Sequence, residues 1–75
     1  MDAPGLFTRM QIARGRLERT LDAYHNGAYL LAIGHVQAPQ PGELERWSDE
    51  LEDAYVEYRA AVSQALRGAQ DQAGS

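Results

Sequence analysis

Apolar residues recur every seven positions in two stretches of this chain, and mostly small residues follow each of them three positions later. The first stretch runs through Met10, Leu17, Tyr24 and Leu31, followed by Ala13, Thr20, Gly27 and Gly34. The second runs through Leu44, Leu51, Tyr58 and Ala65, followed by Trp47, Ala54, Ala61 and Gly68. Large residues that alternate with small ones at coiled-coil spacing allow two helices to approach closely and interlock. The pattern predicts an all-α fold built on one helix pair.

Between the two stretches lies the sequence Gln-Ala-Pro-Gln-Pro-Gly, which is rich in residues that end helices. A short breaker makes its flanking helices antiparallel neighbours. Capping-box and C-terminal stop signals set the outer limits of the two helices. The sequence thus predicts one domain over residues 1–75, with a helix over about 8–36, a breaker over 37–42, a helix over about 43–67 and a disordered tail over 68–75.

Two details of this hairpin follow from the spacing. The apolar stripe keeps its phase across Asn26 and Gly27, which favours one continuous first helix over two shorter helices that meet there. If the chain folds back around Pro39, Leu31 lies opposite Trp47.

The chain is too small to be stabilised easily by one hairpin. It has 75 residues and no cysteine, so disulfides and thiolate metal sites are excluded. Chains below roughly 80 residues commonly need a disulfide, a metal or a partner chain. We therefore expect association, most simply a two-fold homodimer that forms a four-helix bundle.

Several apolar residues lie off the main stripe, where one partner helix cannot cover them. Such an excess of apolar surface is typical of an oligomer interface. The residues that we expect to mediate self-association are Ile12, Tyr29, Leu30, Ile33, Val36 and Leu66.

The charge of the chain is acidic and unevenly distributed. The net charge is −4, and the second half carries three arginines against eight acids. An acidic chain repels a phosphate backbone, so nucleic acid is an unfavoured partner in spite of the arginines within residues 9–19. Within one hairpin this basic segment lies far from the acidic residues at the start of the second helix. A second chain could bring the basic and acidic segments together. The acidic face that we expect to bind a partner protein comprises Glu45, Asp49 and Glu52.

No motif for catalysis or for a cofactor is visible. Glu18, Asp22 and His25 resemble metal-ligand spacing on a helix, but they project away from the apolar stripe, so a solvated polar face is the better interpretation. His35 is placed to cap the end of the first helix, and no nucleophile is placed to partner it. We expect no catalytic, metal or cofactor residues.

The uncharged segment 23–42 is too interrupted to span a membrane, and no leader sequence is visible, which favours a cytoplasmic protein. The sequence therefore predicts a non-enzymatic accessory, adaptor or regulatory protein that self-associates and binds a partner protein. The alternatives are a bundle that binds a metal, or a small molecule in a pocket lined by its tyrosines, and a nucleic-acid-associated regulator.

Overall fold

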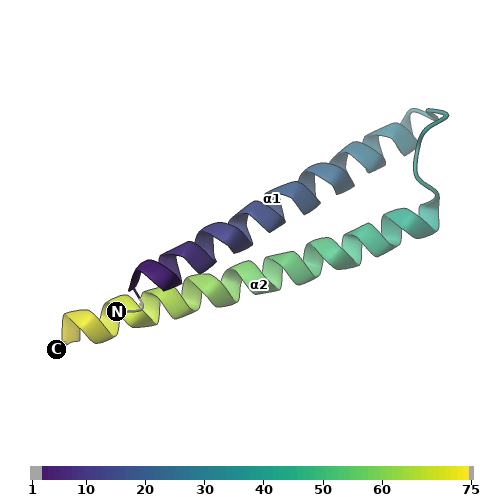
Figure 1. Cartoon of the computed structure of the whole chain (residues 1–75). Coiled ribbons are helices and arrows are strands. Elements are labelled where there is room, and N and C mark those ends of the chain that lie inside the picture. Colours follow the sequence, from purple (N-terminus) through teal and green to yellow (C-terminus); the bar gives the residue numbers. More distant parts are fainter. Residues whose placement is uncertain (1–2, 75) are drawn as a thin grey trace.

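Two long helices form an antiparallel hairpin in the computed structural model (Figure 1), which describes the backbone of residues 3–74 and the side chains of residues 5–71. Helix α1 spans Ala3–Ala32 and helix α2 spans Pro41–Gly74. Residues 3–74 contain no strand. The predicted all-helical hairpin is confirmed, and α1 passes through Asn26 and Gly27 without a break.

The loop end of α1 is set by Gly34. Its backbone has φ = 69°, a left-handed conformation that glycine adopts without a Cβ clash. The Gly34 N–H donates to the carbonyl of Leu31 (3.1 Å), and the His35 N–H donates to the carbonyl of Leu30 (2.9 Å). This pair of bonds is the Schellman motif, which satisfies the last carbonyls of a helix. The helix therefore ends at Ala32 rather than near residue 36.

Both the ring and the backbone of His35 hold the loop. Its Nδ1 accepts a hydrogen bond from the Gln37 N–H (3.0 Å). Its carbonyl also accepts from the Ala38 N–H (3.1 Å). The loop is thus held by local bonds around His35.

Both helices are longer at the open end of the hairpin than the sequence suggests. Helix α1 begins at Ala3, so Thr8 lies inside it and does not cap it. Helix α2 continues past Gly68, and the tail expected to be disordered is helical as far as Gly74, with Ser75 outside the described residues. At Gly68 the side chain of Leu6 occupies the space where a Cβ would stand, its Cδ1 only 2.6 Å from that position. Contact between the two extensions explains why a glycine does not end α2.

Small residues occupy the line along which the two helices approach most closely. The buried residues are Ala13, Gly27, Ala54 and Ala61. No large side chain among the described residues is fully buried. Thr20 also lies along this line, and its hydroxyl donates to the Arg16 carbonyl of its own helix (2.7 Å), so it needs no partner on α2.

The helices diverge toward the loop, as Figure 1 shows, and Trp47 fills the space between them there. A Cβ on Gly27 would lie 2.7 Å from Cζ3 of Trp47 and 3.1 Å from Cγ of Pro39. Trp47 therefore packs on Gly27, whereas the sequence predicted that it would lie opposite Leu31. The shift in register follows from the Schellman motif, because it moves the fold-back point from Pro39 toward the middle of segment 33–40.

The hairpin is elongated and exposes a large surface. Its extents are 58 × 15 × 13 Å and its radius of gyration is 16.8 Å. A compact domain of this length has a radius of gyration of about 11 Å. The exposed area is 5718 Å², whereas a folded monomer of this mass exposes about 4,600 Å².

Candidate functional site

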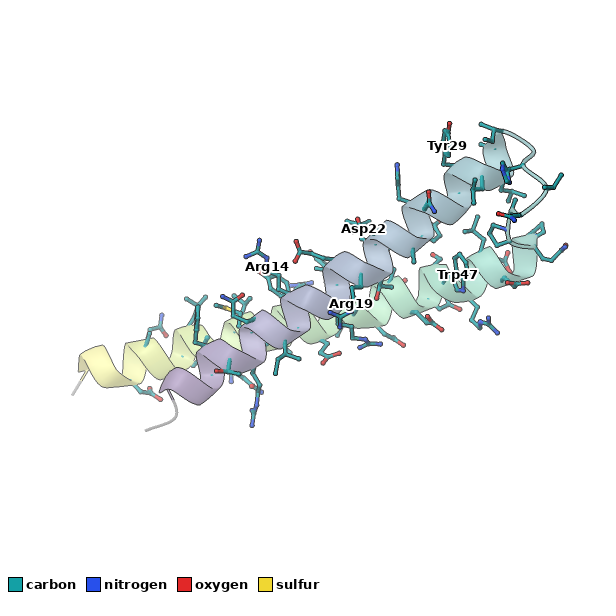
Figure 2. All side chains as sticks on the ribbon, turned by 45° about the horizontal axis from the view of Figure 1, so that its top comes forward. Arg14, Arg19, Asp22, Tyr29 and Trp47 are labelled. Atoms are coloured by element: carbon teal, nitrogen blue, oxygen red, sulfur yellow. The ribbon has the colours of Figure 1, made fainter. Side chains whose placement is uncertain are left out.

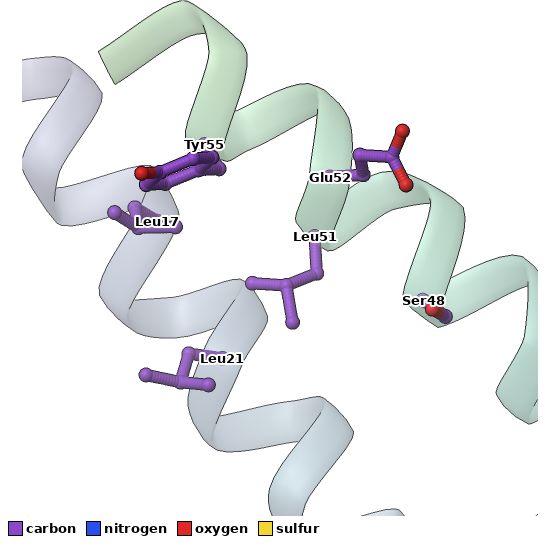
Figure 3. A pocket seen from close by; sticks show the side chains of 6 residues that line it. All are labelled: Leu17, Leu21, Ser48, Leu51, Glu52 and Tyr55. Atoms are coloured by element: carbon purple, nitrogen blue, oxygen red, sulfur yellow. The ribbon is translucent and has the colours of Figure 1, made fainter. Parts of the chain in front are cut away.

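An open apolar groove runs between the helices on one long face of the hairpin (Figure 3). It has a volume of about 440 Å³. Leu17 and Leu21 of α1 meet Leu51 and Tyr55 of α2 across it, with the polar side chains of Ser48 and Glu52 at one edge. Leu21 is 49% exposed and Tyr55 is 50% exposed, so the groove lies open to solvent.

Helical spacing extends this groove along the molecule. Residues separated by three, four, seven or eleven positions lie on the same side of a helix. On α1 such steps connect Phe7, Met10, Leu17 and Leu21, and on α2 they connect Leu51, Tyr55, Val62 and Leu66. We call these eight residues the apolar face. Phe7 and Leu66, at its open end, are both more than half exposed.

The opposite long face is polar. There Arg16 of α1 forms an ion pair with Glu57 of α2. Seven residues nearer the open end on each helix, Nη1 of Arg9 donates to Oε1 of Gln64 (3.4 Å). We call these four residues the charged face. The hairpin therefore has one apolar and one charged long face.

The six residues expected to mediate self-association are not brought together into one surface. Leu66 belongs to the apolar face, whereas Ile12, 63% exposed, lies on the side of α1 that carries Arg9 and Arg16. Tyr29 points away from α2, as Figure 2 shows.

The other three residues of that set lie near the loop. Leu30 is half-buried in a cavity beside Trp47, Ile33 lies just beyond the end of α1, and Val36, in the loop, is 95% exposed. No single flat partner surface covers residues spread in this way.

Sequence reasoning missed the apolar face because it placed the large residues of the seven-residue stripes, such as Leu17 and Leu51, in the contact between the two helices. In a two-helix structure each helix buries only a narrow line, and here small residues occupy it. The neighbouring large residues are consequently displaced to one side of the contact. The alternation of large and small residues in the sequence could have revealed this face. Where small residues form the closest contact between the helices, which we call the seam, the large residues beside them do not fit into it.

The acidic face is exposed on the loop half of α2. Glu45, Asp49 and Glu52 follow at helical steps of four and three, and all three are exposed. Glu52 also lines the apolar groove, so the acidic face borders the apolar face.

Three of the four arginines of α1 contact other side chains of the protein. In addition to the Arg9 and Arg16 contacts, Nε of Arg14 lies 3.6 Å from Oε1 of Glu18, one turn away on the same helix.

A second cavity, of about 390 Å³, lies beside Trp47 at the loop end. Its walls include the amide side chains of Asn26, Gln37 and Gln40. Within the part of the chain that the structure describes, no group of three or more His, Asp or Glu side chains is arranged to hold a metal ion. Neither described helix has an apolar stretch long enough to cross a bilayer.

Comparison of the chain with protein-family models, with curated proteins and with solved structures finds no match.

Proposed function

We propose that this protein is a non-enzymatic helical hairpin that acts by self-association through its apolar face and by binding a partner protein. The observation that carries the proposal is the groove, in which apolar side chains from both helices converge and stay exposed. An exposed apolar surface of this extent is unusual for a stable monomer and common at interfaces.

The thin seam supports the same proposal. Its buried residues are alanines and a glycine, which remove little apolar area from water compared with leucine or phenylalanine. Two such chains that pack through their apolar faces form a four-helix bundle with the large residues at its centre.

The mass of the protein in solution tests self-association. We expect light scattering at micromolar concentration to give twice the chain mass of 8.3 kDa, with dissociation on dilution. A mass of one chain at every concentration, together with a cooperative melt, would contradict the proposal.

For the partner protein, we propose the acidic face as the contact surface, because its carboxylates are exposed and lie beside the apolar face without being part of its apolar lining. A partner recognised in this way is basic, and its binding weakens as salt screens the charges. Reversing the charge of Glu45 and Asp49 together, the two members of the acidic face that do not line the groove, should abolish capture of that partner. Unchanged capture at low salt would show that the acidic face is only a solvated surface.

A second candidate function is binding of a small molecule beside Trp47, because this cavity combines an aromatic ring with several amide groups. Trp47 is the only tryptophan of the chain, so its fluorescence reports directly on the cavity. A saturable change with one compound from a metabolite panel, lost in Asn26→Leu, would favour this function over self-association alone.

A further inference from the structure

We infer that a second copy of this chain covers the apolar face in antiparallel orientation, so that the loop of one hairpin lies beside the open end of the other. This inference rests on the proposed self-association and adds the occupant of the groove and its direction. Each chain exposes about 1,100 Å² more than a compact monomer of its mass. Two chains that bury this excess would form an interface of about 2,200 Å², within the range of stable homodimers.

The direction of the second copy follows from the charges that border the groove. On α1, Arg14 lies seven residues before Leu21 and Glu18 follows Arg14 by one turn. On α2, the guanidinium of Arg59 lies 5.8 Å from the ring centre of Tyr55, and Glu52 lines the groove. Arg14 thus lies within the apolar face, seven residues from both Phe7 and Leu21, whereas Glu18, Glu52 and Arg59 lie beside it. We call these four charged residues the charged rim.

The rim has the same order on both helices. The Arg16–Glu57 and Arg9–Gln64 contacts fix the register of the hairpin. In that register Arg14 and Arg59 lie on the open-end side of the Leu17–Tyr55 level, Glu18 lies close to that level, and Glu52 lies on the loop side.

An antiparallel copy centred on Tyr55 places Arg59 of one chain over Glu52 of the other. A parallel copy, with both loops at the same end, places arginine over arginine and glutamate over glutamate. Like charges that face each other across an interface are destabilising, whereas opposite charges fix orientation and register. The antiparallel copy covers the apolar groove and pairs Arg59 with Glu52 of the other chain.

The rest of the molecule has the same polarity. Six of the seven arginines lie in the half of the hairpin near the open end, and the loop half carries Arg46 against Asp22 and six acids between Glu43 and Asp53. Two hairpins laid antiparallel align these opposite charge distributions over their whole length.

Pulsed electron paramagnetic resonance on single spin labels measures this orientation directly. The chain has no cysteine, so Gln70→Cys and Glu45→Cys each give one label, on an exposed site near one end of α2. At 1.5 Å per residue, an antiparallel dimer centred on Tyr55 separates the two 70 labels by about 45 Å along the axis and the two 45 labels by about 30 Å. Mixing the two labelled proteins brings a 70 label within about 8 Å, along the axis, of a 45 label on the other chain.

The expected result is long distances in both homogeneous samples and a new short distance in the mixed sample. Short distances in the homogeneous samples and long ones in the mixture would show a parallel dimer, which overturns the orientation and leaves self-association intact. A monomeric mass for the unlabelled protein would overturn both.

A rim-exchanged variant tests the charges themselves. The changes Glu52→Arg and Arg59→Glu preserve complementarity between two antiparallel copies of the variant and remove it between variant and wild type. We expect the variant to dimerise with itself and to exchange poorly with tagged wild-type chains. Preferential pairing with wild type would contradict the antiparallel arrangement.

Discussion

On one long face of the hairpin, leucines and a tyrosine from the two helices meet without covering one another. On the other face Arg16 and Arg9 reach across to Glu57 and Gln64. The charged face closes within a single chain, because long side chains can span the gap and keep their charges in water. The apolar face is left open and needs a surface from outside the chain. The difference shows that one face of a hairpin can satisfy its side chains by contacts within the chain, while the other face leaves apolar side chains exposed to solvent.

The largest expected effect comes from placing a charge on the apolar face. Leu21→Arg removes burial worth about 2 kcal/mol in each chain of a symmetric dimer and adds a charge to an apolar interface. The dissociation constant should therefore rise by about a thousandfold or more. Sedimentation equilibrium over a range of concentrations measures this change.

Ile12→Arg is the matched control, because Ile12 is also an exposed aliphatic residue of α1 but lies on the side of the helix that carries Arg9 and Arg16. Its dissociation constant should stay within a few-fold of the wild-type value. Equal weakening by the two substitutions would show that the two faces do not differ in the way described here.

The seam shared by both faces should be the next most sensitive region. Ala54 is 0% exposed, so Ala54→Leu forces the helices apart and should lower the free energy of unfolding by about 1–3 kcal/mol. Chemical denaturation at a fixed chain concentration provides the measurement. Gln64→Leu, on the exposed charged face, should change it by about 0.5 kcal/mol or less, and similar losses at both positions would contradict the proposed seam.

Two glycines inside α1 should respond to alanine with opposite signs. Gly27→Ala places a methyl group 2.7 Å from the ring of Trp47, and the strain should outweigh the gain in helix propensity and leave a net loss of about 1 kcal/mol. At Gly15 the nearest atom is Nη1 of the flexible Arg19 side chain, at 3.3 Å. Gly15→Ala should therefore raise the melting temperature, and a rise for both variants would show that Trp47 does not pack on Gly27 in solution.

Much of this architecture could be predicted from the sequence. Seven-residue spacing gave both helices, and preserved phase gave the unbroken passage through Asn26 and Gly27. The end of α1 at Ala32 could not be predicted with the same rules, because Gly34 ends the helix through a Schellman motif that depends on the backbone of the next residue. The resulting shift in register moved Trp47 onto Gly27.

The apolar face was predicted less well than the fold. Periodicity shows which residues share one side of a helix, but not how wide a strip the facing helix covers. The alanines at positions 13, 54 and 61 occupy the seam, so their large neighbours remain exposed. Of the residues expected to mediate self-association, only Leu66 lies on this face.

The smallest expected effect is on the charged face. Arg16 and Glu57 are each about half exposed, so their ion pair contributes less than about 1 kcal/mol to the free energy of unfolding. A double-mutant cycle with Arg16→Ala and Glu57→Ala should give a coupling of this size. The coupling should disappear near 1 M salt, where the screening length falls to about 3 Å, and its persistence there would indicate a desolvated pair.

The reactivity of two tyrosines tests the central claim most directly. Tyr55 on the apolar face and Tyr29 away from it are similarly exposed in the single hairpin, at 50% and 57%. If the apolar face is covered by another copy of the chain, hydroxyl-radical labelling followed by mass spectrometry should modify Tyr55 several times more slowly than Tyr29, and dilution should bring the two rates together. Equal rates at every protein concentration would contradict the account.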